Sequence, residues 1–211
     1  MNVKKIFITG CLIMLIINIC VNDLYGQVSE KAGIPNAQTE KKNYVGTSVL
    51  SVLSLIPGDN SYYAGIDYGR KLNQKNDLVV GLNIYKYISP MSVPLNDTTS
   101  YPGHVVSSGI VFAFQHYMWK NVFIDQLCNP LILVYKNEND NHKTTGFMLL
   151  LAARIGLHFN FNAFNVPLYI EAGGEINYWP VNRNVPDNFK QTDNKYNNYV
   201  FAPAIQIGIM F

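Results

Sequence analysis

The feature that most constrains the fold is an alternation of apolar with polar or small residues at every second position. It runs for about ten residues at a time between short clusters of turn-forming residues, the pattern of β-strands with two different faces. After residue 43 the chain has no sustained helical period and no apolar run long enough to cross a membrane as a helix. The pattern therefore predicts an all-β protein.

Eight segments carry the alternation. Four are regular, at 77–88, 145–159, 167–178 and 201–211. Three fit less closely, at 61–70, 104–119 and 121–135, and a segment at 44–55 completes the set without selecting a face for its apolar residues. In the middle of 121–135, Asn129-Pro130 predicts a β-bulge, because a closed barrel has no free edge that could hold a proline.

Alternation alone fits a soluble barrel as well as a membrane barrel, and a soluble sandwich with ordinary core aromatics is a further alternative. Charged residues make up only 14% of the chain, against about 25% in a typical soluble domain. The polar faces carry mainly Gly, Ala, Asn and Tyr, and most charges lie in the connections. A Lys or Arg facing lipid at mid-membrane costs about 2–4 kcal/mol, and the central positions of the apolar faces contain neither. We therefore predict a closed, antiparallel, up-and-down transmembrane β-barrel of eight strands over residues 44–211.

The connections and the aromatic residues indicate how such a barrel would lie in a membrane. Connections at 71–76, 120–121 and 160–166 are short, whereas those at 89–103 and 180–198 are long, as expected for periplasmic turns and outer loops. The two long loops are where we expect any extracellular partner to bind. Aromatic residues near the strand ends predict girdles at the membrane boundaries: Tyr85, Tyr87, Tyr117, Trp119, Tyr135, Tyr178, Trp179 and Tyr199.

The N-terminus has the layout of a secretory signal peptide over residues 1–26. Lys4 and Lys5 precede an apolar run at 6–19, and Gly26 stands before the expected cleavage site. A membrane anchor is the alternative, but the uninterrupted apolar run is shorter than a spanning helix needs. Residues 27–43 are expected to form a flexible lead-in. Signal removal leaves Cys128 as the only cysteine, so the mature chain can form neither an intrachain disulfide nor a cysteine metal site.

The last residues carry a resemblance to a known family. The chain ends in Phe211, preceded at every second position by Ile209, Ile207 and Ile205. In this it resembles the small eight-stranded outer-membrane proteins of the OmpA and OmpX type, and the outer-membrane β-barrel domain proteins common in Bacteroidetes. The resemblance implies a place in the outer membrane, in contact with its lipid, and recognition of these four residues by the barrel assembly machinery. The sequence departs from the family at Ile209, where an aromatic residue is more usual.

Four ionisable residues fall on the inward faces of the expected strands: Asp67, Arg154, Glu171 and Glu175. We interpret them as a structural charge network that fills the interior, with a proton or ion path as the alternative. If the hairpin turns near Asn162-Ala163, Arg154 lies opposite Glu171 or one diagonal away, with Glu175 higher up. Because side chains fill an eight-stranded barrel, we expect no open pore.

No catalytic, metal or cofactor site stands out. His104 lies near Ser107 and Ser108, but Ser107 points to the opposite face and Ser108 is about 13 Å along the strand. The net charge of +2 and the absence of a basic cluster argue against nucleic acid. We therefore expect a barrel with a structural or surface-interaction role that is not an enzyme. A lipid-modifying outer-membrane enzyme and a small-ligand or solute barrel are the alternatives.

Overall fold

The computed structural model describes residues 42–49, 51, 61–88, 93, 103–137, 142–187, 189–191 and 198–211. The expected signal peptide, nearly all of the lead-in and most of the loop at 89–103 lie outside these residues. Within the described ranges, no helix has both the length and the apolar character needed to cross a membrane.

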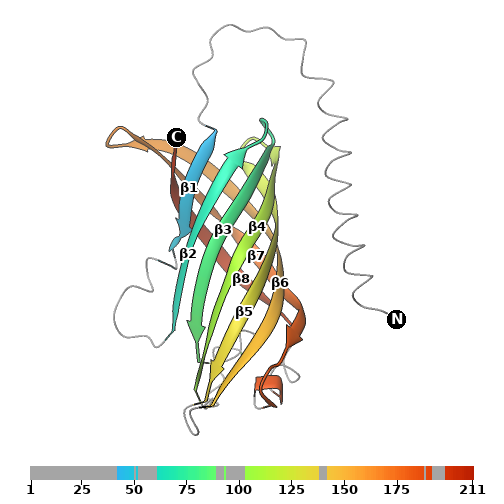
Figure 1. The fold of residues 1–211 in the computed structure, drawn as a ribbon. Helices are drawn as coiled ribbons and strands as arrows, with labels where there is room; N and C mark the ends of the chain where they lie inside the picture. Colours follow the sequence, from blue (N-terminus) through green and yellow to red (C-terminus); the bar gives the residue numbers. More distant parts are fainter. Residues whose placement is uncertain are drawn as a thin grey trace, which may run out of the picture. The chain divides into compact units, whose positions relative to one another are not determined.

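Eight antiparallel strands form a closed barrel, in which each strand pairs with its sequence neighbours and β8 pairs back with β1 (Figure 1). The strands are β1 (Asn43–Ser48), β2 (Tyr62–Lys71), β3 (Asn76–Tyr87), β4 (His104–Trp119), β5 (Val122–Lys136), β6 (Lys143–Ala163), β7 (Val166–Arg183) and β8 (Tyr199–Met210). The predicted closed, up-and-down, eight-stranded barrel is confirmed.

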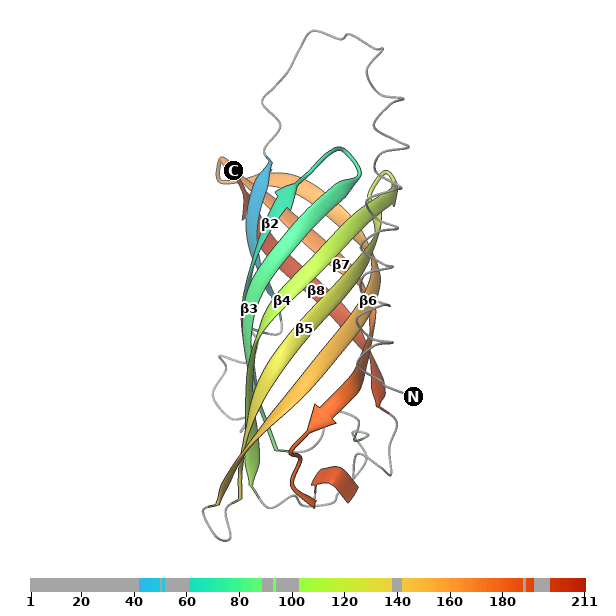
Figure 2. The ribbon, with the colours of Figure 1, turned by 45° about the vertical axis from the view of Figure 1, so that its right-hand side comes forward.

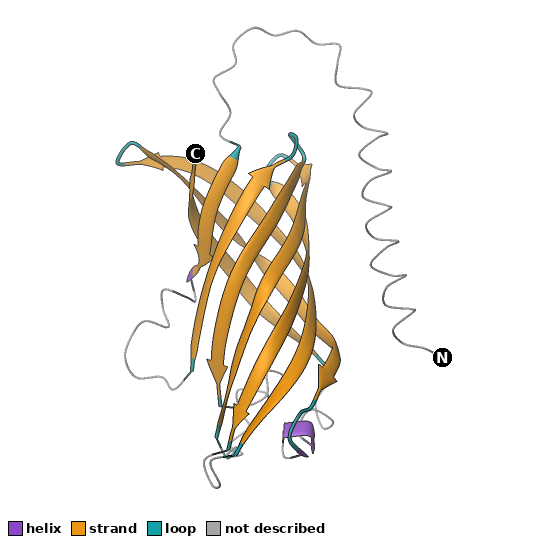
Figure 3. Ribbon diagram, in the orientation of Figure 1, coloured by secondary structure: helices purple, strands orange, loops and turns teal. Residues whose placement is uncertain are grey.

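The two ends of the barrel differ. One end, which we call the turn end, carries the short β2–β3, β4–β5 and β6–β7 connections and the C-terminus (Figure 2). The opposite end, the loop end, carries the β3–β4, β5–β6 and β7–β8 connections. A short helical segment around Phe189 lies at the loop end, whereas strands make up nearly all of the barrel (Figure 3). The β6–β7 turn is shorter than expected from the sequence, because pairing continues to Ala163↔Val166.

Burial alternates along the strands as the sequence predicts. In β3, Leu78, Val80 and Leu82 are exposed on the outside, whereas Val79 and Asn83 are buried inside. The predicted aromatic girdles are correct only in part. Trp119, Tyr178 and Tyr199 are exposed on the outer face, but the others occupy inward positions of the alternation. The inward-facing members are Tyr85, Tyr87, Tyr117, Tyr135 and Trp179.

The bulge predicted at Asn129-Pro130 is absent from the described strand pairing. The β5–β6 register is continuous through Pro130↔Leu149, and the β4–β5 ladder merely skips the positions between Gly109↔Leu131 and Phe112↔Cys128 without a register shift. A bulge lies instead in β7, where Leu149↔Val181 is followed by Leu151↔Tyr178, so that Trp179 and Pro180 together oppose one residue. The missing N–H of a proline is thus accommodated by a gap in the ladder at one site and by an extra residue at the other.

The first strand is shorter than predicted. β1 ends at Ser48 rather than near residue 55, and residues 50 and 52–60 lie outside the described part of the chain. β1 closes the barrel by pairing with β8 from Tyr44↔Met210 to Ser48↔Gln206. Asn43 and Phe211 complete this seam by exchanging backbone hydrogen bonds of 3.1 and 2.8 Å.

Candidate functional site

The interior of the barrel is divided into a polar half and an apolar half. Toward the turn end, the buried charged side chains gather beside a small apolar cluster that includes Tyr44 and Tyr169. The buried polar and charged residues of this half are Asp77, Gln115, Asp125, Arg154, His158 and Glu171. Toward the loop end the buried inward side chains are mainly apolar: Val105, Leu131, Leu133, Tyr135, Met148, Leu150 and Trp179. The polar half is the candidate functional site, because most of the ionisable groups expected from the sequence lie there.

Arg154 lies at the centre of this polar network. Its guanidinium contacts the Asp125 carboxylate directly and lies 3.5 Å from Glu171 Oε2. It also lies over the ring of Phe123, 5.4 Å from its centroid, where a cation is attracted to the π face. Because Arg154, Asp125 and Glu171 are all buried, the single positive charge of Arg154 offsets carboxylate charge that would otherwise be uncompensated away from water.

Glu171 connects Arg154 to a second group of residues. Its Oε1 accepts a 2.7 Å hydrogen bond from the Gln115 amide and lies 2.9 Å from His158 Nδ1. Gln115 in turn accepts a hydrogen bond from the Tyr44 hydroxyl. The His158 ring is stacked on the ring of Tyr169 at 5.4 Å. This cluster cross-links β1, β4, β6 and β7 through the interior.

The other two residues expected in the network have different partners. Asp67 accepts a 3.2 Å hydrogen bond from the Gln206 amide of β8. Glu175 is opposite Arg154 in the strand register, but its carboxylate accepts a 2.7 Å hydrogen bond from Asn177. The structure thus brings Arg154 and Glu171 together, and places Asp67 and Glu175 at the sides of that pair.

Sequence reasoning missed Asp125, the residue in closest contact with Arg154. The residues with odd numbers from Phe123 to Tyr135 share the inward side of β5, and Asp125 is among them. An unbroken alternation through Asn129-Pro130 would have identified it. The predicted bulge removed that signal, because one inserted residue reverses the facing of everything on its far side.

The apolar half is sealed by a residue from the β7–β8 connection. Phe189 is buried, packs edge-to-face on Tyr135 with ring centroids 5.3 Å apart, and belongs to the same cluster as Trp179. This part of the predicted outer loop 180–198 therefore packs into the barrel mouth, where it fills space that would otherwise admit water.

The histidines and serines do not form a catalytic arrangement in the described residues. Ser107 is buried and faces the interior, whereas Ser108 is exposed on the outside, four residues along β4 from His104. Among the residues that the structure describes, no three His, Cys, Asp or Glu side chains are grouped so that they could hold a metal ion.

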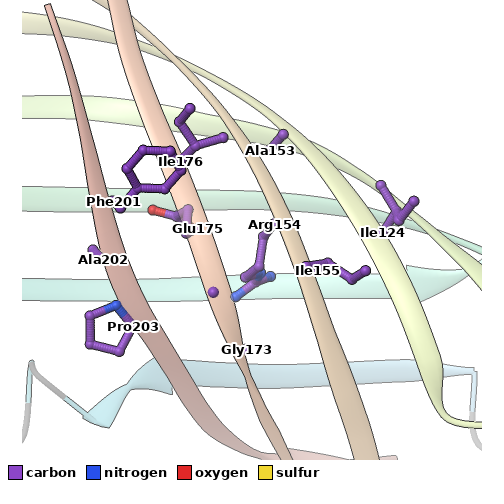
Figure 4. A pocket seen from close by; sticks show the side chains of 11 residues that line it. Ile124, Ala153, Arg154, Ile155, Gly173, Glu175, Ile176, Phe201, Ala202 and Pro203 are labelled. Atoms are coloured by element: carbon purple, nitrogen blue, oxygen red, sulfur yellow. The ribbon is translucent and has the colours of Figure 1, made fainter.

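A groove of about 720 Å³ lies in the wall formed by β6, β7 and β8 (Figure 4). It forms where Gly174 leaves open space on the outer face, with Ile155, Ile176 and Phe201 among the apolar side chains around it. Arg154 and Glu175 also line it, through the thin part of the wall at Gly173 and Gly174. Its outward side chains are apolar, which suits contact with hydrocarbon.

Comparisons with known proteins give little further information. No protein-family model matches the chain, and no curated protein matches it. Among solved structures, it is similar to the crystal structure of Neisserial surface protein A (NspA), with a TM-score of 0.38 and 12% sequence identity over 81% of this chain and 94% of that chain. The closed, eight-stranded antiparallel barrel is established by the strand pairing of this chain itself.

Proposed function

We propose that this chain is an integral outer-membrane barrel with a structural or surface-interaction role, in which the interior polar network fills the barrel and stabilises its fold. The single observation that supports the membrane location best is the outer face of the strands. Large apolar side chains are exposed there on strand after strand, including Ile66, Leu82, Phe112, Ile155 and Phe201. Soluble monomers rarely expose apolar patches larger than a few hundred Å².

The position of the charges supports the same proposal. On the described strands, outward-facing charged residues occur only near strand ends: Arg70, Lys86, Lys136, Lys143 and Arg183. The stretch between them is free of Asp, Glu, Lys and Arg on the outer face. This matches the cost of a charge against lipid, which is about 2–4 kcal/mol at the midplane and falls toward the boundaries.

The packed interior supports a structural role. Trp179, Tyr169 and Phe123 are fully buried inside the barrel, and Arg154 is held by two carboxylates. We expect such an interior to leave no continuous aqueous path through the described strands, and therefore to give no channel conductance. We also propose that the chain is not an enzyme. The connections at the loop end, including those within 89–103 and 180–198, are the surface where an extracellular partner would bind.

The membrane location is tested by two lysine substitutions on the outer face, one within β3 and one directly after its end. Leu82 lies near the middle of β3 and is 60% exposed, whereas Ile88 lies just beyond its loop-end terminus and is 46% exposed. In a bilayer, Leu82→Lys should destabilise the barrel by about 2–4 kcal/mol and Ile88→Lys by about 0–1 kcal/mol. The measurement is denaturant unfolding of the chain refolded in lipid vesicles.

A water-exposed barrel would behave differently. Both lysines would then lie on a solvated surface, where substitutions usually change stability by no more than about 0.5 kcal/mol. Equal, small effects at Leu82 and Ile88 would contradict the membrane location, as would recovery of the chain as a soluble periplasmic protein on cell fractionation.

A further inference from the structure

The β6–β7 hairpin extends beyond the strands on either side of it at the turn end. The last β5–β6 pair is Val122↔Leu157, and the first β7–β8 pair is Leu168↔Ile209. Residues 159–167 therefore form a two-stranded ribbon with no strand beside it in the described part of the chain (Figure 1). We call this segment the projecting hairpin.

The two faces of the projecting hairpin differ sharply. One face continues the apolar outer wall of the barrel from Leu157 toward the turn end. It carries three exposed side chains, Phe159, Phe161 and Val166. Asn160 and Asn162 lie on the opposite face. The segment 159–168 contains no Asp, Glu, Lys or Arg, whereas the other two turns at this end carry Lys75 and Lys120.

The tip of the hairpin is a two-residue turn formed by Phe164 and Asn165, with φ of 53° and 63°. Positive φ at both central residues is the geometry of a type I′ turn, which Asn and Gly adopt far more readily than Phe. Phe164 is nonetheless at the first position, and its side chain is 100% exposed. An aromatic residue in an unfavourable conformation, with nothing from the described part of its chain covering it, indicates a surface that another apolar phase covers.

The length of the apolar face identifies that phase. From Phe147 to Phe161 the outward side chains of β6 extend over 14 residues of strand, or about 46 Å at ~3.3 Å per residue. With a tilt of about 40°, this is roughly 35 Å along the membrane normal, compared with an apolar band of about 25 Å. If the apolar band is centred on this face, it ends near Phe159, about 30 Å from Phe147 along the membrane normal. The hairpin therefore begins at the edge of the hydrocarbon and extends into the headgroup region.

We propose that the projecting hairpin is a lipid anchor, whose Phe159, Phe161 and Phe164 side chains lie in the headgroup–acyl boundary of the leaflet at the turn end. The partner is a phospholipid leaflet, which requires no charge from the protein and continues the surface already in contact with Ile155 and Leu157. The inference rests on the proposed membrane location. An added protein strand fits less well, because Pro167 removes a donor from one edge of the ribbon.

The experiment places a tryptophan at chosen positions in the full chain, refolded into phosphatidylcholine vesicles with brominated acyl chains. Phe161→Trp and Phe164→Trp probe the anchor, and Asn162→Trp probes the opposite face of the same ribbon. Leu82→Trp is the reference for hydrocarbon contact. Each signal is read as the difference from the parent chain, which contains only Trp119 and Trp179.

We expect Phe161→Trp and Phe164→Trp to be quenched by the brominated lipid and protected from aqueous iodide, and Asn162→Trp to show the reverse preference. Equal accessibility of all three to iodide would overturn the inference. Protection from both quenchers that increases with the protein-to-lipid ratio would also overturn it, because a second copy would then cover the hairpin. If Leu82→Trp is quenched and the hairpin positions are not, only the anchor fails; if Leu82→Trp is not quenched either, the membrane location itself is wrong.

Discussion

Replacing Arg154 with methionine tests the interior network most directly. Methionine keeps much of the length of the side chain and its packing on Phe123, and removes the positive charge. Arg154 and its two carboxylate partners are each less than 10% exposed. The substitution therefore leaves Asp125 and Glu171 buried without the cation that compensates them.

The structure indicates how the stability lost in Arg154→Met divides between the two carboxylates, Asp125 and Glu171. Breaking a buried ion pair by removing one partner typically costs about 3–5 kcal/mol, and we expect Arg154→Met to fall in this range. Glu171 would keep the Gln115 amide and the nearby His158 ring. Asp125 would keep fewer hydrogen-bond partners, because its Oδ2 bonds Arg154 and its Oδ1 has no hydrogen-bond partner among the described residues. The larger share of the loss should therefore come from Asp125.

The assay is a pair of double-mutant cycles on the free energy of unfolding in denaturant. We expect Asp125→Asn to restore more stability in the Arg154→Met background than Glu171→Gln does. Glu175→Gln is the matched control, because its carboxylate bonds Asn177 and it should couple weakly to Arg154. A coupling near zero between Arg154 and Asp125 would refute the geometry of the network. Coupling only to Glu175, which lies opposite Arg154 in the strand register, would show that the Arg154 side chain pairs across β6–β7 instead of with Asp125.

A deletion at the seam and a substitution in the apolar half test these two parts of the barrel. Deleting Phe211 should slow barrel assembly, because Phe211 exchanges hydrogen bonds with Asn43 and ends the segment that resembles the family's assembly signal. The measurement is the rate at which the compact, heat-modifiable band appears on gels. An unchanged rate would show that the preceding isoleucines suffice. Trp179→Ala should lower the unfolding free energy by about 3–5 kcal/mol. Trp119→Ala should lower it less, because Trp119 is exposed on the outer face and its removal leaves no cavity inside the barrel. Equal effects of the two would contradict the buried position of Trp179.

The strand alternation predicted the fold because it is a local property. In β3, one face is apolar from Leu78 to Ile84, whereas the other includes Gly81 and Asn83, so the facing of each residue follows from its position alone. Prolines were harder to interpret. Pro130 and Pro180 both interrupt a strand, but only Pro180 lies at a bulge. Which one is bulged depends on the registers of the neighbouring strands, and these are set by pairing that a single segment does not encode.

The site was predictable to the same extent. Arg154 and Glu171 were found because the alternation of their own strands places them inside. Asp125 was lost when a bulge was assumed in β5, and Phe189 could not be anticipated, because its burial depends on how the β7–β8 connection folds back into the barrel mouth. Tyr85 and Trp179 were placed at the membrane boundary from their nearness to strand ends, although the alternation of their strands already pointed them inward.

The seam between β1 and β8 has a consequence for the order of folding. Neighbouring hairpins such as β6–β7 form between residues that are close in sequence, but Tyr44 must find Met210, at nearly the full separation of the barrel. Such non-local pairing is slow, because the entropy of closing the intervening chain is lost before any contact is gained. Until the seam forms, β1 and β8 each present an unpaired edge that can add a strand from another molecule. The chain therefore remains open to aggregation from the start of its synthesis until its eighth strand has paired with its first.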